Sequence, residues 1–103
     1  MVYNFCMVTA KIKTAKQMER HLKGIANHYR IAILLYIEDN DKVALGDIVE
    51  AVGGNEKTIG EHTRRLYIAG LINKKYRGHF VEHSLSPYGK IFVDFLKTFS
   101  HIK

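Results

Sequence analysis

The segment from Leu45 to Leu85 constrains the fold most, because two short helical patterns meet at a glycine pair and lead into a basic, β-rich run. The first pattern repeats apolar residues at i, i+3, i+4 and i+7, which is one face of a short helix. These residues are Leu45, Ile48, Val49 and Val52. The glycine pair is followed by Asn55, whose side-chain oxygen can cap a second helix, and Gly70 can end that helix in the left-handed conformation.

Two strands are expected after the second helix, joined at Arg77-Gly78-His79, where glycine supplies a positive φ. A helix, a tight glycine turn, a second helix and a hairpin form a winged helix-turn-helix, which lays one helix in the major groove of DNA. The expected fold class is therefore α+β and mostly α, with a two-stranded β-wing. We expect one domain over residues 1–103, with the helix-turn-helix at 45–69, the wing at 71–85 and a C-terminal helix at 87–101.

The flanking elements carry their own signals. Thr14 and Gln17 match a capping box, before an apolar stripe of Met18, Leu22, Ile25 and Ala26. A second helix is predicted from about Tyr29 to Glu38, followed by a loop over residues 38–41. Its inward residues are expected to be Ile31, Leu34 and Leu35. Ser86-Pro87 starts the last helix, with a capping hydroxyl before a proline at the first helical position.

The net charge of +6 is concentrated on the expected DNA-facing segment, because residues 55–79 carry six basic and two acidic side chains. A basic surface on such a motif is the electrostatic footprint that DNA phosphates require. On the second helix, Ile59, Thr63 and Leu66 are expected to face inward. The candidate DNA-binding residues of that helix are Asn55, Lys57, Thr58, Gly60, Glu61, Arg64 and Arg65. An arginine there can bridge guanine O6 and N7.

The wing is expected to contact phosphates rather than bases. Its candidate residues are Lys74, Lys75, Arg77 and His79. Tyr76 and Phe80 are interpreted as packing residues, since a two-stranded wing offers little room for stacked bases.

The last helix carries an apolar band that is too broad for a helix packed from one side. The band consists of Ile91, Phe92, Phe95, Leu96 and Phe99. Either this band is core, or part of it faces a second copy of the chain. Exposed apolar patches of this size are rare, and two-fold dimers are the commonest oligomers, which favours a homodimer. The expected dimer contacts are Phe92, Phe95, Leu96 and Phe99.

The single cysteine, Cys6, excludes an intrachain disulfide and a multi-thiolate metal site, and it fits a cytoplasmic protein. Met1–Val8 is apolar, but it lacks the basic region and cleavage site of a signal peptide. No apolar run approaches the roughly 20 residues that span a bilayer. Neither a membrane nor a cofactor is expected as a partner.

A metal site is not expected within one chain. His79 and His83 would share a face of the second strand, but about 13 Å apart at roughly 3.3 Å per residue, which is too far to share an ion. A site between subunits on the final helices stays open. No phosphate-binding glycine loop, nucleophile elbow or paired carboxylates indicate an enzyme.

Residues 22–85 resemble the winged-helix repressors of the arsenical-repressor (ArsR) type. Residues 22–31 are similar to that family's opening helix, turn and arginine, although His28 stands where proline is usual. Thr58-Ile59 and His62 match its recognition helix, and residues 69–72 match its Ala-Gly-Leu-Val. Residues 85–90 look more like the exit from the wing in multiple-antibiotic-resistance-type winged helices.

This chain departs from the family at three places. The helix before the turn lacks the paired cysteines of the metal-sensing members, Gly60 replaces a usual serine, and Glu61 replaces a basic or neutral residue. We expect a dimeric, sequence-specific binder of double-stranded DNA that acts as a transcriptional regulator, a repressor by resemblance, with an unidentified effector. The alternatives are a winged helix used for contact with an acidic protein partner, and a replication or partition accessory of a virus or plasmid.

Overall fold

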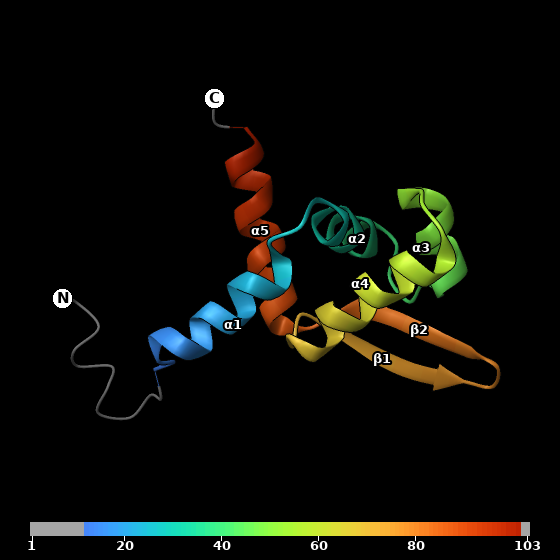
Figure 1. Ribbon diagram of the computed structural model, residues 1–103, viewed down its shortest axis with the longest axis horizontal. Helices are drawn as coiled ribbons and strands as arrows, with labels where there is room; N and C mark the ends of the chain where they lie inside the picture. The colour runs from blue at the N-terminus through green and yellow to red at the C-terminus, as the bar shows by residue number, and fades with distance from the viewer. Residues whose placement is uncertain (1–11, 102–103) are drawn as a thin grey trace.

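The computed structural model describes residues 12–101, and this part of the chain forms five helices and one antiparallel pair of strands (Figure 1). The elements follow one another as α1 (Ala15–Ile25), α2 (His28–Asp39), α3 (Leu45–Val52), α4 (Glu56–Ile68), β1 (Ile72–Arg77), β2 (Phe80–Leu85) and α5 (Pro87–Ser100). The predicted winged helix-turn-helix is therefore confirmed. Cys6 and the segment Met1–Val8 lie outside the described residues.

The core lies between α2, the helix-turn-helix, the base of the sheet and the first half of α5. Its fully buried side chains come from every one of these elements: Ile33, Leu34, Ile37, Ile48, Ile59, Thr63, Leu66, Leu71, Ile72 and Val93. Helix α1 contributes Ile25, whereas Met18 and Leu22 of its apolar stripe are about half exposed. Most of the stripe predicted on α1 is therefore not part of this core.

Helix α2 differs from the prediction in its inward face and in its end. Ile33 and Ile37 are buried with Leu34, whereas Ile31 and Leu35 are only half-buried. The reason is that α2 packs against α3, α4, β2 and α5, so its neighbours on several sides decide which residues are covered. The helix ends at Asp39, one residue after the predicted end at Glu38.

Local capping signals account for most helix boundaries. The Thr14 hydroxyl accepts from the Gln17 backbone N–H at 3.2 Å, and the Gln17 side chain accepts from the Thr14 N–H at 2.8 Å. Asn55 caps α4 through Thr58, and Ser86 caps α5 ahead of Pro87. Gly70 has φ +80°, which a residue with a side chain rarely adopts, so the predicted end of α4 is also confirmed.

The wing is a hairpin in which Ile72 pairs with Leu85 and Arg77 pairs with Phe80. His79 and His83 were expected to share one face of the second strand. The turn instead holds Gly78 and His79, so His79 precedes β2 and does not share a strand face with His83. His83 is buried instead, and its Nδ1 donates to the Val43 carbonyl oxygen at 2.9 Å. This contact ties β2 to the segment before α3.

The buried His83 and the half-buried His62 make the stability of the fold depend on pH. Burial is the main cause that lowers the pKa of both His83 and His62 below the ordinary 6.5. The folded state therefore binds fewer protons than the unfolded chain. We expect the two histidines to make their whole contribution to the free energy of unfolding above about pH 6.5. This contribution is lost as the pH falls from there toward their lower pKa values in the folded state.

Urea unfolding at a series of pH values from 7.5 to 5 measures this dependence. The amide of Asn can still donate to the Val43 oxygen, but it does not titrate, so His83→Asn should flatten the slope. An equally steep slope in His83→Asn would assign the pH dependence to other groups.

Candidate nucleic-acid interface

One face of helix α4 packs into the core, and the opposite face is polar. Ile59, Thr63 and Leu66 are buried as predicted, and the Thr63 hydroxyl donates to the Ile59 carbonyl oxygen at 2.8 Å. The other predicted residues of α4 lie on or near the surface, with the exception of Gly60. A Cβ at Gly60 would lie 3.5 Å from Leu45 Cδ2, so this residue faces α3.

Glu61 joins the two arginines of this face. Its carboxylate accepts from Arg64 Nε at 2.9 Å and from Arg64 Nη2 at 2.7 Å, and Arg65 Nε lies 3.2 Å away. The hydrogen bonds from Arg64 are the main cause that lowers the Glu61 pKa to about 2. The carboxylate is therefore charged at neutral pH, and it holds both guanidinium groups on a surface that keeps a net positive charge.

The wing residues divide between two faces, because side chains alternate along a strand. Lys75 and Arg77 lie on the outer face, where Arg77 Nε is 3.2 Å from Glu82 Oε1. Lys74 lies on the inner face, and its ammonium group is 4.9 Å from the centre of the Tyr67 ring on α4. Wing and α4 thus carry their charges side by side.

Tyr76 and Phe80 do not pack against the domain, contrary to the interpretation from the sequence. Their side chains are 76% and 66% exposed. The hairpin extends beyond the helices at its tip (Figure 1), and Phe80 borders the start of α3 without being covered by it.

A contact between α2 and α4 was not found by the sequence analysis. Arg30 Nη1 lies 3.3 Å from His62 Nδ1, and the His62 ring stacks on Tyr29 with centroids 5.4 Å apart. Burial lowers the pKa of His62, and the Arg30 charge lowers it further. An unprotonated nitrogen of a neutral imidazole can accept a hydrogen bond from the Arg30 guanidinium. Both residues appear in the family resemblance, but their pairing connects positions 32 residues apart in sequence.

The C-terminal end of α4 is tied to both α1 and α5. The carbonyl oxygen of Ala69 accepts from His21 Nδ1 at 2.6 Å, that of Gly70 from the Ser86 hydroxyl at 2.6 Å, and that of Leu71 from the Ser86 N–H at 3.1 Å. Two glycines permit this approach. A Cβ at Gly24 would lie 2.3 Å from Ala69 Cβ, and one at Gly89 would lie 2.0 Å from the Leu71 oxygen.

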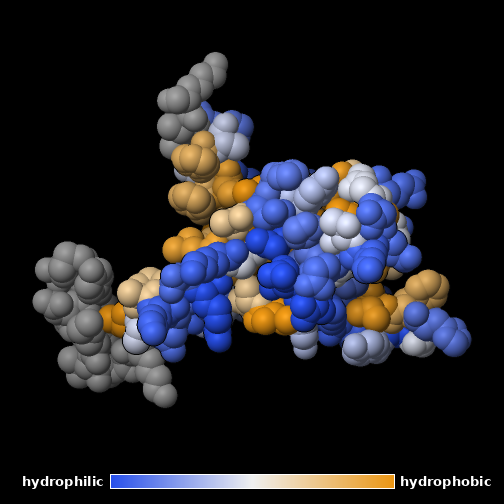
Figure 2. Space-filling view, in the orientation of Figure 1, coloured by the Kyte–Doolittle hydropathy of each residue, from blue (hydrophilic) through white to orange (hydrophobic). Residues whose placement is uncertain are grey.

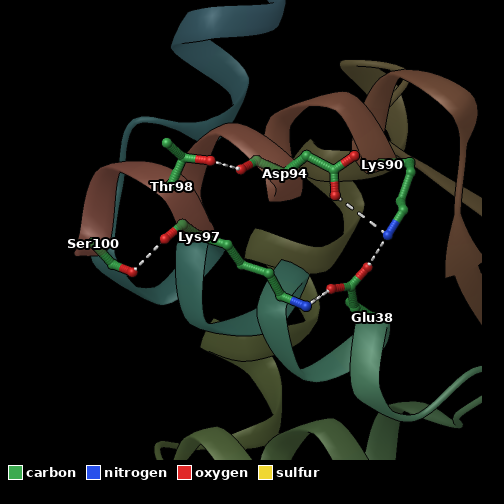
Figure 3. A network of polar contacts seen from close by, with 6 residues as sticks. All are labelled: Glu38, Lys90, Asp94, Lys97, Thr98 and Ser100. Carbon is green, nitrogen blue, oxygen red and sulfur yellow. Dashed lines mark hydrogen bonds and ion pairs between the residues drawn. The ribbon is translucent and has the colours of Figure 1, made fainter. Parts of the chain in front are cut away.

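Helix α5 is fastened to α2 by an ionic cluster (Figure 3). The Glu38 side chain is only 10% exposed, and it accepts from Lys90 Nζ at 2.6 Å and from Lys97. These two lysines hold the pKa of the Glu38 carboxyl below its usual range. Lys90 also lies 3.3 Å from Asp94. Glu38 lies in the last turn of α2, as predicted, and from there its side chain reaches α5.

An apolar surface lies on α1 and α5, away from the wing (Figure 2). Of the residues predicted to join two copies, Phe95 and Phe99 are 58% and 60% exposed and stack with centroids 5.6 Å apart. Phe92 and Leu96 are half-buried and pack on the core. Met18, Leu22 and Ile91 extend the exposed surface.

Residues 12–101 contain neither a cluster of metal ligands nor a membrane-spanning helix. No group of three His, Cys, Asp or Glu side chains in this range could hold a metal ion. None of its helices is both long enough and apolar enough to cross a membrane.

Comparisons with known proteins show the fold. No protein-family model and no curated protein matches the sequence. HlyU from Vibrio cholerae has a TM-score of 0.76 at 23% identity, with 86% of this chain and 97% of that chain covered. The homodimeric winged helix-turn-helix DNA-binding domain Mb0332 from Mycobacterium bovis, a possible ArsR-family regulator, has a TM-score of 0.75 at 20% identity, with 92% and 94% covered.

The transcriptional repressor BigR from Xylella fastidiosa is also similar, with a TM-score of 0.74 at 14% identity, covering 86% of this chain and 91% of that chain. These likenesses cover 86% to 92% of this chain. The chain therefore has the winged helix-turn-helix fold that it shares with the DNA-binding domain from Mycobacterium and with the repressor BigR.

Proposed function

We propose that the protein is a homodimeric, sequence-specific binder of double-stranded DNA that regulates transcription, most simply as a repressor. The observation that carries this proposal is the adjacent placement of a basic recognition helix and a basic wing on a winged helix fold. The similar structures support it, because one is a homodimeric DNA-binding domain and another is a transcriptional repressor. The proposed activity is binding without catalysis, and a protein with this function would act in the cytoplasm.

In this proposal α4 enters the major groove. Lys57, Thr58 and Arg64 reach base edges or phosphates, and Arg65 and the Asn55 end of the helix lie along the backbone. The wing contacts the flanking phosphates through Lys75, Arg77 and His79, with Lys74 between wing and helix. Gly60 lies on the side of α4 that faces Leu45 of α3, so it is proposed to contribute less to DNA contact than the residues on the exposed face.

Binding to duplex DNA as a function of salt tests the proposal, and Lys75→Gln tests the wing. Each phosphate contact releases counterions, so its loss should lower the slope of log K against log salt by roughly 0.9. Lys75→Gln should weaken binding to all duplexes about equally. Lys16→Gln removes the same charge from the exposed start of α1 and should leave the slope unchanged. A changed base preference in Lys75→Gln would mean that the wing reads sequence.

The dimer is proposed to form through the apolar surface of α1 and α5. Since Phe95 is 58% exposed, Phe95→Asp does not open a core position, and it should yield a folded monomer. Phe80→Asp places the same charge on the exposed wing and should leave a dimer intact. Light scattering at micromolar concentration measures both. A monomeric wild-type protein, or a dimeric Phe95→Asp protein, would contradict this interface.

A second candidate function, contact with an acidic protein partner, is favoured by the exposure of Tyr76 and Phe80 beside the wing cations. Aromatic side chains with neighbouring arginine are enriched at protein interfaces. The duplex titration separates the two functions, because only the DNA-binding protein should bind mixed-sequence duplexes with a steep dependence on salt.

A further inference from the structure

The end of the wing carries two aromatic side chains that no other element covers. Tyr76 and Phe80 are 76% and 66% exposed, and no other large apolar side chain in residues 12–101 is as exposed. Figure 2 shows apolar surface near the end of the wing, among hydrophilic side chains. Because aromatic rings gain free energy when they leave water, this placement favours contact with another molecule.

The strand register places the two rings on opposite faces of the hairpin. Tyr76 pairs with Val81 and Arg77 pairs with Phe80, and neighbouring pairs point to opposite sides of a sheet. Tyr76 is therefore on the inner face, and Phe80 is on the outer face beside the turn. The tip of the wing is thus a wedge with one ring on each side.

Positive charge surrounds both rings. Lys74 lies on the inner face, and Lys75 and Arg77 lie on the outer face. The two strands carry one carboxylate, that of Glu82, which lies 3.2 Å from Arg77 Nε. The charge of this surface therefore fits a polyanion.

The surface of the wing continues onto α4. The ammonium group of Lys74 lies 4.9 Å from the centre of the Tyr67 ring, so the inner face of the wing is joined to the helix proposed to enter DNA. A duplex bound by α4 is therefore within reach of the wing tip, and it supplies the negative charge that the lysines and Arg77 require.

We propose that the wing tip enters the minor groove beside the major-groove segment bound by α4, and that Phe80 inserts between two neighbouring base pairs. This inference rests on the proposed DNA-binding function. Proteins that bind the minor groove combine lysine and arginine contacts with an inserted apolar side chain, often phenylalanine. Phe80 has no polar side-chain atom and lies beside the turn, whereas Tyr76 carries a hydroxyl group and lies one pair farther from the tip.

Insertion of the wing changes the shape of the DNA. The minor groove of B-DNA is about 6 Å wide, which is too narrow for a hairpin with a ring on each face. The groove therefore widens, and one base step unstacks and kinks by roughly 20–90°. Pyrimidine–purine steps such as TA and CA are the most easily kinked, so the preferred site should hold one of them under the wing. The wing then contributes to selectivity without hydrogen bonds to bases.

Permanganate oxidation and energy transfer measure this change. Permanganate oxidises thymines that are not stacked, so it locates a kinked step in a bound duplex. The probe is a duplex recovered by selection of bound sequences, with a fluorophore at each end. With the wild-type protein we expect a reactive thymine under the wing and a shorter distance between the two ends. Phe80→Ala should abolish both changes and weaken binding roughly threefold to tenfold, because the gain from burying the ring is partly offset by the cost of unstacking.

Phe80→Leu is the matched control, because leucine is also used as an inserted side chain. This variant should keep the reactive thymine and the bend, and so should Tyr76→Ala. None of the three substitutions changes a charge, so the dependence of binding on salt should equal that of the wild-type protein in each.

The outcomes separate this inference from the function on which it rests. A wild-type protein that binds the duplex without a kink overturns the insertion and leaves DNA binding in place. A kink that persists in Phe80→Ala overturns it too, and assigns the exposed ring to contact with a protein partner. A protein that binds no duplex overturns both the insertion and the proposed function.

Discussion

Gly89→Ala is expected to lower the free energy of unfolding by about 3 kcal/mol or more, the range of severe overpacking. The added methyl group would lie 2.0 Å from the Leu71 carbonyl oxygen and 3.1 Å from its carbon. Both atoms belong to the backbone, so no side-chain rotation can relieve the clash. The first turn of α5 would have to move away from the end of α4, and the Ser86 bonds to Gly70 and Leu71 would be lost with it.

Gly46→Ala is the matched control. Gly46 is also a helical residue, but a Cβ there would have no neighbour within 4 Å. Alanine loses less conformational freedom than glycine in a helix, so this variant should gain up to about 1 kcal/mol. Chemical unfolding measures both variants. Equal stability of Gly89→Ala and the wild-type protein would mean that α5 does not approach Leu71 as closely as described.

Arg64→Ala is expected to weaken binding to the preferred DNA site by about 1–3 kcal/mol, with a much smaller effect on random duplexes. The side chain lies on the exposed face of α4, and Glu61 holds its guanidinium group by two hydrogen bonds. The guanidinium group is therefore held in one orientation, and the N–H groups that Glu61 leaves free can donate to O6 and N7 of guanine. Selection of bound sequences, followed by titration with the selected site, gives both affinities.

Glu61→Gln is the control for Arg64. Without the carboxylate the charges of the two neighbouring arginines are no longer offset, so non-specific binding should become stronger and more dependent on salt. Selectivity should fall, because Arg64 is no longer held. If Arg64→Ala and Lys57→Ala together leave duplex binding unchanged, DNA binding through α4 is wrong and the protein-contact function takes its place.

The helix-turn-helix and the wing could be predicted from sequence because their signals are local. Asn55, Gly70 and Ser86 act on the backbone within a few residues, and each behaves as its type predicts. The inward face of α2 could not be predicted in the same way. Apolar residues occupy nearly every position from Ile31 to Ile37, so no periodicity distinguishes the buried side chains. The packing of the elements around α2 decides which of them are covered.

The charges of the candidate DNA surface were also visible in the sequence, but their pairing was not deduced. The spacing of Glu61 to Arg64 and Arg65 is that of helical ion pairs, so this contact had a usable signal. The contacts of Arg30 with His62 and of His21 with Ala69 join residues 32 and 48 positions apart. Only the tertiary fold brings these residues together.

The two sets of contacts that hold α5 also affect the distance between the α4 helices of a dimer. Its N-cap Ser86 is bonded to Gly70 at the end of α4, and its Lys90 and Lys97 are paired with Glu38 of α2. Two sets of contacts therefore set the angle of α5 to the rest of the domain. If two copies join along α5, that angle sets the distance between their α4 helices. Half-sites lie about 34 Å apart, or a multiple of it. The carboxylate of Glu38, which is not among the proposed DNA contacts, would then help to determine the distance between the half-sites that the dimer can bind.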